Sequence, residues 1–552
     1  MTHPQSNGQV NGPSRTDQTA IVIGAGLSGI RMMYELNKRG VSGKCLEAGA
    51  GIGGTWFWNR YPGARADSEV WVYILTFLEE IGYDWDWKER FPSQPELESY
   101  FNGVVDYLGL RDNFFLNTRV KSARYDDSKN VWHVSTSQGD EYTCDFLITA
   151  TGPLSTPLKP PFVGLDTFKG QWLQTALWPD QKVDFTGKRV GVFGTGATGA
   201  QIIPLIAHAA KQLTVFQRTP NYVLPGRNFV FTKDQERELK KDFKGIAQRV
   251  RAQPFGGDMV GTTRVSSDVK NKEALNQIFD YGWEQGGFRY IFNTVNDMLT
   301  NVDCNEAASE FIRQKIRAIV QDPATAEALC PYYPLMSKRP PLGHFYYETF
   351  NRPNVELVDL RKDPVQKITP NGLQTLAKEF DLDIIVFGIG FDAVTGTLNS
   401  IDIRGAGNKP LKDHLECDLG TGYGIATTDF PNFFMILGPQ SAWANLPIVI
   451  DTAADWIGKA ISHMQERGHN RIEAKKELTR SWTEEVDKHF WGTLLGKGAQ
   501  ETGAWHVGGN VDGKPLRCYW YFGGIPRYLE LCAKEVESGY PGFTFSNALQ
   551  AH

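Results

Sequence analysis

The feature that most constrains the fold of this chain is a pair of glycine-rich turns, each placed between a strand-like and a helix-like segment. The first turn follows the apolar run at residues 20–23 and precedes a segment with apolar residues at helical spacing. Its glycines, Gly24, Gly26 and Gly29, let the backbone approach a pyrophosphate closely. Glu47 ends the next strand-like run, where a carboxylate accepts hydrogen bonds from ribose hydroxyls. This order predicts a β-α-β unit that binds a dinucleotide.

The second turn has the same context but a different residue at the end of its second strand. It follows the apolar run at residues 188–193, and a helix and a strand at residues 213–217 come next. Arg218 takes the place of the carboxylate, and a guanidinium suits the 2′-phosphate of NADP better than the ribose hydroxyl of NAD. The residues predicted to hold this second dinucleotide are Gly194, Thr195, Gly196, Ala197, Thr198, Gly199, Ala200, Gln217, Arg218 and Thr219.

These two units predict an α/β chain with two Rossmann-like dinucleotide-binding domains, for FAD and NADP, and a helical insertion. A proline-rich link at residues 153–161 separates the units. Residues 230–330 contain charged stretches of helical period, which indicates that the insertion lies there. Strand-like runs return at residues 355–358 and 383–387. The first 18 residues are rich in Ser, Thr, Asn, Gln and Gly and predict a disordered tail.

Composition and charge exclude several classes of function. The 552 residues carry 58 Lys and Arg against 63 Asp and Glu, so no broad basic field is available for nucleic acid. No apolar stretch is long enough to predict a membrane span. The seven cysteines never form a CxxC pair, which predicts a reduced, cytoplasmic protein and argues against a dithiol reductase. The ten histidines form no HxH or HxxxH pair, so we predict no metal site.

Several segments resemble the Baeyer–Villiger monooxygenases, which are flavoproteins that insert an oxygen atom beside a ketone. Residues 53–67 read GGTWFWNRYPGARAD, which is similar to the GGTW-WNRYPGxxxD segment of that family. The family fingerprint FxGxxxHxxxW is matched at Phe168, Gly170 and Trp178, with Gln174 in place of the histidine. The other similar segments are residues 338–340, 346–353, 390–392, 430–433, 438–439 and 505–514.

The resemblance implies a particular order of domains. The FAD-binding domain is split between residues 19–152 and 390–552, and the NADP-binding domain between residues 153–229 and 331–389. The helical insertion interrupts the latter. FAD and NADP(H) are the implied cofactors, and a small-molecule ketone and O₂ are the implied substrates. We expect a monomer or weak oligomer without nucleic-acid or membrane partners.

The resemblance also implies roles for single residues in the reaction. Reduced flavin and O₂ give a C4a-peroxide that should be anionic to attack a ketone, and Arg339 matches the arginine beside it. An arginine stays charged near neutral pH and offers a fork of donors. Asp67 would orient this guanidinium, and Lys338 would reach the 2′-phosphate together with Arg218 and Thr219.

Further positions match the family's contacts with cofactor and substrate. Trp443 and Leu446 match the loop that lines the substrate. The other cofactor-binding positions implied by the resemblance are Thr55, Trp56, Phe57, Trp58, Arg65, Ala66, Asp67, Tyr73, Val120 and Trp505.

Two other interpretations stay open at this point. An N- or S-oxygenating flavin monooxygenase shares the plan of two dinucleotide domains, although Asp67 and the Arg339 segment favour ketone oxygenation. The third interpretation is a flavin-binding protein that oxidises NADPH without oxygenating a substrate. The replacement of the fingerprint histidine by Gln174 is the observation that favours it. Turnover of ketones and amines, with hydrogen peroxide measured, separates the three.

Overall fold

The first strand begins earlier in the chain than the sequence analysis predicted. The computed structural model describes residues 15–75, 77, 85–259 and 261–547. Strand β1 (Arg15–Ile23) includes four residues that we assigned to a disordered tail, and this assignment was wrong for them. Their backbone pairs in parallel with the start of β6 (Glu141–Thr149), which holds them in the sheet. Residues 1–14 of the predicted tail lie outside the described residues.

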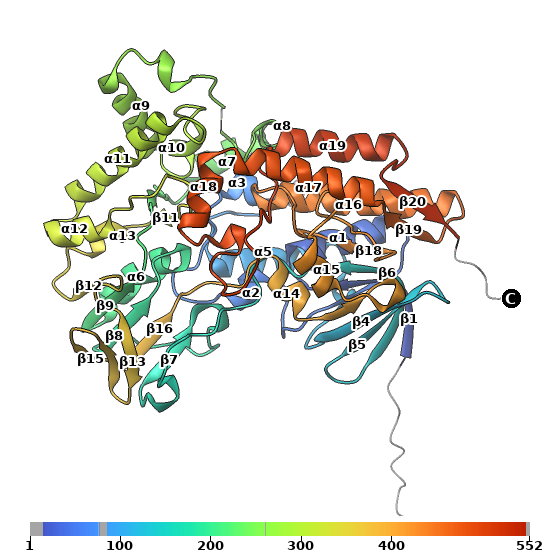
Figure 1. Ribbon diagram of the computed structural model, residues 1–552, viewed down its shortest axis with the longest axis horizontal. Helices are drawn as coiled ribbons and strands as arrows, with labels where there is room; N and C mark the ends of the chain where they lie inside the picture. Colours follow the sequence, from blue (N-terminus) through green and yellow to red (C-terminus); the bar gives the residue numbers. More distant parts are fainter. Residues whose placement is uncertain (1–14, 76, 78–84, 260, 548–552) are drawn as a thin grey trace, which may run out of the picture.

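An eight-stranded sheet forms one part of the molecule (Figure 1). Its strands, in spatial order, are β17 (Asp402–Arg404), β4 (Val120–Asp126), β5 (Val131–Thr136), β6, β1, β2 (Gly43–Leu46) and β3 (Phe114–Phe115), with β18 (Phe433–Met435) also paired to β6. The central strands β6, β1 and β2 are parallel, which explains the unbroken apolar run in β1. Because β17 and β18 come from late in the chain, this sheet joins the two ends of the sequence.

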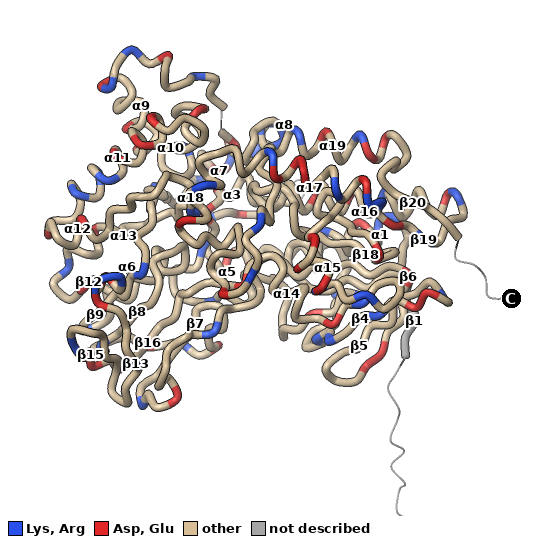
Figure 2. The backbone as a smooth tube through the Cα atoms, viewed as in Figure 1, with Lys and Arg blue, Asp and Glu red and all other residues tan. Residues whose placement is uncertain are grey.

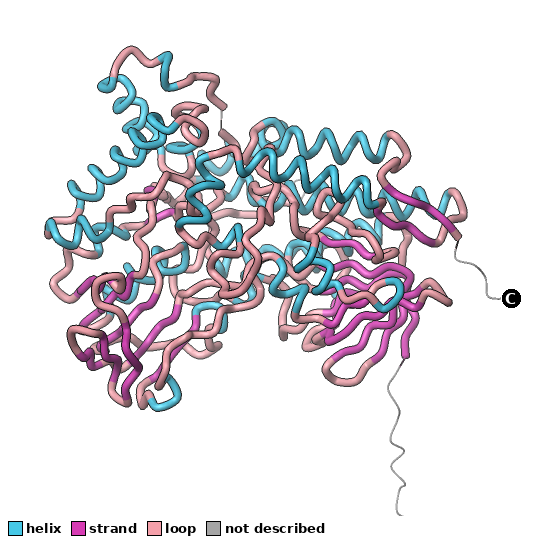
Figure 3. Tube along the Cα trace, viewed as in Figure 1, coloured by secondary structure: helices cyan, strands magenta, loops and turns pink. Residues whose placement is uncertain are grey.

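A five-stranded parallel sheet forms the second unit (Figure 3). Its strands, in spatial order, are β12 (Val355–Asp359), β9 (Gln212–Gln217), β8 (Arg189–Phe193), β16 (Ile384–Phe387) and β7 (Gln171–Gln174). Every pair of neighbours is parallel, and all four residues of β16 are buried. The two sheets lie apart in the lower half of the view, and most helices lie above them (Figure 3).

The two glycine turns have the same geometry. The first leads from β1 into α1 (Leu27–Lys38), and the second leads from β8 into α6 (Ala197–Ala209). Gly24 has a φ of 108°, and a Cβ there would lie 2.6 Å from the carbonyl oxygen of Ala150. Gly194 has a φ of 103°, and its Cβ would lie 2.3 Å from the carbonyl oxygen of Gly388. Only glycine fits at either position, which confirms the prediction of two equivalent Rossmann-like units.

Two chain segments connect the sheets, and these connections pair with each other. One runs from β6 to β7 through the proline-rich link, and the other leads away from the end of β16. The N–H of Leu158 donates to the carbonyl oxygen of Gly390 at 3.0 Å. Pro157 and Phe391 form an antiparallel bridge beside this bond. The two connections therefore form a short two-stranded ribbon, which we call the linker ribbon.

Helices occupy the stretches where the sequence analysis expected an insertion. They lie between two short strands that pair in parallel, β10 (Leu224–Pro225) and β11 (Leu342–Gly343). These helices are α7 (Lys233–Lys241), α8 (Phe243–Ala252), α9 (Lys272–Gln285), α10 (Arg289–Phe292), α11 (Val302–Ile319) and α12 (Pro323–Leu329). The C-terminal part of the chain adds α16 (Leu446–Glu466), α17 (Lys476–Trp491), α18 (Leu494–Glu501) and α19 (Ile525–Glu537).

Further helices and strands complete the fold. They are α2 (Thr55–Trp58), α3 (Val70–Tyr73), α5 (Gln94–Tyr107), α13 (Tyr346–Thr349), α14 (Thr395–Asn399), α15 (Leu411–Cys417), β13 (Val365–Thr369), β14 (Gly372–Thr375), β15 (Glu379–Asp381), β19 (Arg471–Ala474) and β20 (Phe543–Ser546). Basic and acidic residues are interspersed over the whole fold (Figure 2). In the part of the chain that the structure describes, no helix combines the length and apolar character that a membrane crossing needs. The described residues also contain no group of three or more His, Cys, Asp or Glu side chains that could hold a metal ion.

Candidate active site

Each glycine turn forms a cradle at the N-terminus of a helix. The first four N–H groups of a helix have no partner within the helix, so they are available to a ligand. A Cβ at Gly196 would meet no atom within 4 Å, so the second cradle has room in front of it. In the first cradle, Gly26 and Gly54 approach so closely that a Cβ at Gly54 would lie 2.6 Å from Gly26 Cα. These residues fit the pyrophosphates of two dinucleotides.

Glu47 supports the first cradle directly. Its buried carboxylate accepts hydrogen bonds from the N–H groups of Ala25 at 2.8 Å and Gly49 at 2.7 Å. Each carboxylate oxygen keeps a further lone pair, so Glu47 can still accept from a ribose hydroxyl. Phe57 and Trp58 lie against the same segment, because a Cβ at Gly49 would come within 2.7 Å and 3.0 Å of their rings.

The other positions matched to flavin contacts differ in how open they are. The indole N–H of Trp56 donates to the hydroxyl of Tyr73 at 3.1 Å, and Trp56 is largely buried. Thr55 is exposed at the start of α2. Ala66 and Val120 are buried, and Val120 packs in the core of the eight-stranded sheet. Only part of this predicted set therefore presents side chains to an open surface.

A basic cluster lies where β9 ends. Arg218 is exposed there, and its neighbour Thr219 is half-buried. Burial, together with the nearby charge of Arg218, lowers the pKa of Lys338 to about 8. Two cations held this close suit a dianionic phosphate. Gln217 was predicted to join them, but its side chain is fully buried and its amide donates to a backbone carbonyl of α12 at 2.8 Å.

Arg339 and Asp67 meet although they lie far apart in the sequence. The distance from Arg339 Nη1 to Asp67 Oδ2 is 2.7 Å. The Asp67 side chain is 5% exposed, whereas the Arg339 side chain is 26% exposed. Asp67 Oδ1 also accepts from the amide of Gln201 in α6 at 3.3 Å, and the guanidinium carbon of Arg339 lies 5.3 Å from the ring centre of Phe288. The buried carboxylate thus fixes the guanidinium and leaves part of it accessible.

Aromatic rings from distant parts of the chain gather beside this ion pair. The ring centre of Phe255 lies 5.4 Å from that of Phe288, 4.8 Å from that of Phe292 and 5.4 Å from that of Trp443. Trp443 stacks on Phe522 at 5.0 Å. Of these five rings, which we call the aromatic wall, the sequence analysis singled out only Trp443. Such a wall suits the apolar skeleton of a small organic molecule.

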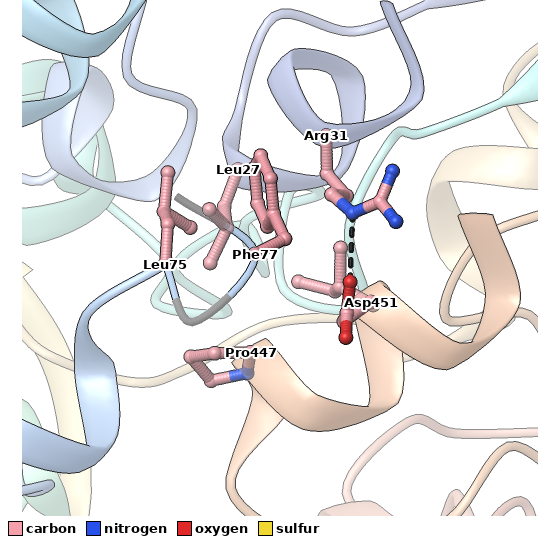
Figure 4. Close-up of a pocket in the computed structure, with 7 residues that line it drawn as sticks. Leu27, Arg31, Leu75, Phe77, Pro447 and Asp451 are labelled. Atoms are coloured by element: carbon pink, nitrogen blue, oxygen red, sulfur yellow. Dashed lines mark hydrogen bonds and ion pairs between the residues drawn. The ribbon is translucent and has the colours of Figure 1, made fainter. Parts of the chain in front are cut away.

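Leu446 begins α16, and the first turns of this helix are tied to α1. Arg31 of α1 donates to Asp451 of α16 at 2.8 Å (Figure 4). Within α1, Arg31 also donates to Glu35 at 2.7 Å. The cavity beside this ion pair measures about 10 Å³, which is room for one water molecule and not for a substrate. Because α1 directly follows the first glycine turn and pairs with α16, the ion pair connects the first cradle to the predicted substrate loop.

The segment that carries Trp505 is docked against residues 391–393. The amide of Asn510 donates to the carbonyl oxygen of Phe391 at 2.8 Å. Lys514 Nζ lies 2.5 Å from Asp392 Oδ1 and also donates to the carbonyl oxygen of Ala393. The ring of Trp505 is only partly buried. Its predicted contact with NADP is therefore sterically open.

His506 joins this docked segment to the basic cluster. It is fully buried, and neither ring nitrogen has a hydrogen-bond partner among the described residues. Burial and the charge of Lys338 lower the pKa of His506 to about 3, so the ring is neutral at physiological pH. The sequence analysis did not single out this histidine, since a lone histidine carries no motif.

Gln174, at the fingerprint position, lies at the end of β7. Its side chain is largely buried, and its amide donates to the carbonyl oxygen of Leu158 at 2.8 Å. Leu158 belongs to the linker ribbon, so the hydrogen bond described for Gln174 goes to the connection between the sheets. Gln174 thus stabilises the linker ribbon and takes no part in the contacts of Arg339 described above.

Four polar residues at the site were missed by the sequence analysis. Gln201, Ser68, Glu69 and Asn445 all hydrogen-bond to residues of the site or to its supporting segments. Ser68 and Glu69 directly follow Asp67 in the sequence, and that adjacency was the one signal available for them. The spatial meeting of Ser68 with Asn445 has no counterpart in the sequence pattern.

Comparisons with known proteins show similarity along almost the whole chain. The flavin-binding monooxygenase-like family model matches residues 17–244. A phenazine N-monooxygenase from Lysobacter antibioticus is 39% identical over 536 residues, which cover 96% of this chain and 97% of that protein. A Baeyer–Villiger monooxygenase from Pseudooceanicola batsensis is 38% identical over 530 residues, which cover 95% of each chain.

A solved structure extends the similarity to three dimensions. Cyclohexanone monooxygenase from Rhodococcus sp. Phi1, bound to NADP⁺, matches with a TM-score of 0.94 and 38% identity, over 97% of this chain and 100% of that one. Similarity at this level covers both Rossmann-like units, the helical part and the C-terminal region. The chain belongs to the Baeyer–Villiger monooxygenases, the FAD- and NADPH-dependent enzymes of the flavin-binding monooxygenase family.

Proposed function

We propose that this enzyme converts a small apolar ketone to an ester or lactone, with Arg339 as a catalytic residue. The observation that carries the proposal is the ion pair of Arg339 with the buried Asp67, placed beside the aromatic wall. Bound FAD, reduced by NADPH, supplies the activation of O₂. Arg339 supplies a fixed positive charge where negative charge develops on oxygen, and a preorganised charge needs no reorganisation during the reaction.

Asp67 and the aromatic wall assist Arg339 in different ways. The carboxylate of Asp67 holds the guanidinium in one orientation, so the charge is aimed before the substrate arrives. The rings of the wall contact an apolar skeleton and exclude water from the space next to Arg339, which strengthens electrostatic interactions there.

N-oxygenation is a second candidate, because one relative of this chain is a phenazine N-monooxygenase. The aromatic wall would accept a flat nitrogen heterocycle as readily as a ketone. An amine nitrogen, however, is itself the nucleophile that attacks the oxygen, so it gains nothing from a stabilised negative charge on that oxygen. The ion pair of Arg339 with Asp67 therefore favours the ketone.

One experiment separates these functions. Purified enzyme with FAD, NADPH and O₂ is offered cyclic ketones, aryl ketones and aromatic nitrogen heterocycles, and NADPH consumption, product and hydrogen peroxide are measured together. We expect esters or lactones in amounts close to the NADPH consumed. N-oxides without esters would establish the second candidate, and hydrogen peroxide with no product would show an uncoupled NADPH oxidase.

We also propose the finer assignments that the sequence supports. The two sheets and the linker ribbon support an FAD domain at residues 19–152 and 390–552 and an NADP domain at residues 153–229 and 331–389. All seven cysteines are free, which supports action in the reducing cytoplasm. We further propose a monomer or weak oligomer that binds neither nucleic acid nor membranes.

Gln174 is expected to act through its hydrogen bond and not as an acid or base. Gln174→His should keep ketone oxygenation within about tenfold of wild type, because a histidine can still donate to the Leu158 carbonyl. Gln174→Ala should lower the rate more, because it leaves that part-buried carbonyl without its donor. Product formation by both variants checks this. Wild type that releases only hydrogen peroxide, with ester formation gained in Gln174→His, would show a chemical role.

The affinity for NADP⁺ is expected to fall at high pH because of Lys338. Its pKa is lowered to about 8 in the coenzyme-free protein, and a bound 2′-phosphate favours the charged amine, so binding takes up a proton above this pH. We expect the Kd for NADP⁺ to rise about tenfold per pH unit above about pH 8, measured by calorimetry. Lys338→Arg keeps its charge and should flatten the profile. An equally flat profile in wild type would contradict the assignment.

A further inference from the structure

Three consecutive side chains, Asp67, Ser68 and Glu69, reach three different parts of the molecule. Asp67 pairs with Arg339 and accepts a hydrogen bond from the side-chain amide of Gln201 in α6. Ser68 contacts the predicted substrate loop, and Glu69 contacts the helical part of the chain. The chain bends at Asp67 and Ser68, just before α3, so the three successive side chains point in different directions and contact separate units. This tripeptide, which we call the 67–69 hub, is the point where those units meet.

Glu69 is the buried centre of an ionic triad. Its carboxylate accepts from Arg90 at 3.0 Å and also pairs with Arg289, and its side chain is 6% exposed. Burial alone would raise the pKa of Glu69, but the charges of Arg289 and Arg90 outweigh it and lower the pKa. Glu69 is therefore ionised at neutral pH, and a buried, paired charge of this kind is costly to disturb.

The triad anchors the residue that lies under the catalytic arginine. Arg289 opens α10, and Phe288, directly before it, places its ring 5.3 Å from the guanidinium carbon of Arg339. Phe288 also contacts Phe255 in the aromatic wall at 5.4 Å. Glu69 thus fixes, through Arg289, both a ring beside Arg339 and one side of the wall.

Arg90 extends the same anchor to the backbone of the helical part. Its guanidinium donates to the carbonyl oxygen of Gln285 at 3.0 Å, at the end of α9, and to that of Arg227 at 3.2 Å. Both carbonyls belong to segments outside the predicted FAD domain. Loss of the Glu69 charge would therefore weaken the hold on Arg289. It would also weaken the hold of Arg90 on the end of α9, which leads into α10.

Ser68 anchors the substrate loop. Its hydroxyl donates to Asn445 Oδ1 at 2.8 Å, and the Asn445 amide donates to the carbonyl oxygen of Val72 at 2.6 Å. The backbone N–H of Asn445 donates in turn to the carbonyl oxygen of Phe255 at 2.8 Å. Asn445 lies between Trp443 and the start of α16. Its three hydrogen bonds therefore fix the position of Trp443 in the aromatic wall.

We propose that Ser68 and Glu69 are positioning residues, which set the aromatic wall, including Phe288, against Arg339 and so couple NADPH oxidation to oxygenation of the ketone. The proposal rests on the ketone oxygenation proposed above. Neither residue is placed to touch the reacting atoms. Their loss should therefore misplace the ketone without slowing the reduction of FAD by NADPH.

The test compares Glu69→Gln and Ser68→Ala with the matched control Glu484→Gln, which removes an exposed charge that pairs, among the described residues, with Arg480. Flavin reduction is followed by stopped-flow absorbance, and ester, hydrogen peroxide and KM for the ketone are measured. We expect Glu69→Gln to raise the KM about tenfold and release most NADPH electrons as hydrogen peroxide, with flavin reduction within about twofold of wild type. Ser68→Ala should raise the KM less, and the control should match wild type.

Further measurements keep the proposal open to refutation. If Glu69→Gln does not fold, Ser68→Ala still carries the test, since it removes a single hydroxyl. Ser68→Ala and a folded Glu69→Gln with wild-type KM and wild-type ester per NADPH would overturn the proposal. Equal losses in flavin reduction and oxygenation would also overturn it, because they indicate general damage.

If wild type oxygenates no ketone, the proposed function has failed. Amide hydrogen exchange at residues 286–292 and 443–446 then tests the hub alone: faster exchange in Glu69→Gln supports it, and unchanged exchange overturns it.

Discussion

In Arg339→Ala, ester formation is expected to fall by a factor of about 10²–10³ or more, while NADPH still reduces the bound FAD. The substitution removes the fixed charge that stabilises negative charge on the attacking oxygen. It leaves both glycine cradles intact, since Arg339 contacts neither of them in the contacts described above. Single-turnover measurements of flavin reduction and of ester formation check the two halves of this expectation separately.

Two further variants sharpen the Arg339 experiment. Arg480→Ala, which removes an arginine whose side chain is 84% exposed, should retain the wild-type rate of ester formation. Arg339→Lys keeps the charge but loses the forked geometry that pairs with Asp67, so it should recover only part of the rate. Ester formation by Arg339→Ala at close to the wild-type rate would show that another group stabilises the charge.

The enzyme is expected to prefer NADPH strongly over NADH, because Arg218, Thr219 and Lys338 gather where the 2′-phosphate would lie. Each charge-assisted hydrogen bond to the phosphate contributes about 1.5–3 kcal/mol, which corresponds to about 10- to 100-fold in affinity. Arg218→Ala should therefore raise the KM for NADPH at least about tenfold and leave the KM for NADH nearly unchanged. Steady-state kinetics with both coenzymes measure this.

The matched control for Arg218 is Arg361→Ala. Arg361 follows β12, the strand next to β9, and its side chain is 50% exposed and paired with Asp359. It should not alter the KM for either coenzyme. Equal kcat/KM values for NADPH and NADH in wild type would show that the basic cluster does not bind a 2′-phosphate.

The Rossmann-like units were predictable from sequence because local geometry leaves few alternatives. Gly24 and Gly194 sit where any side chain would strike a carbonyl oxygen of a neighbouring segment, so the glycine pattern reports the turn directly. The pairing of Arg339 with Asp67 came from the family resemblance, and the structure places their atoms 2.7 Å apart. The roles of these residues in the reaction stay predictions.

The rest of the site depends on contacts between segments that no local pattern connects. Trp443 was found as part of a motif, but Phe255 and Phe522 join it only once the helical part and the C-terminal region pack together. Gln217 shows the opposite case, and its cofactor contact stays a prediction. Its place at the end of a strand predicted a cofactor contact, whereas its amide turns inward to a carbonyl of α12. The sequence pattern places the end of the strand, but the packing of α12 against it decides which partner the side chain finds.

The linker ribbon has a consequence for how the two dinucleotide units move. A domain held by one flexible tether samples many orientations, and its cofactor meets the other only at a low effective concentration. Here two connections cross side by side and are bonded to each other, from Leu158 to Gly390 and through the bridge of Pro157 with Phe391. A double crossing of this kind allows bending about one axis and resists twisting and separation. When both cofactors are bound, this double connection would keep the nicotinamide and the flavin close to one mutual orientation.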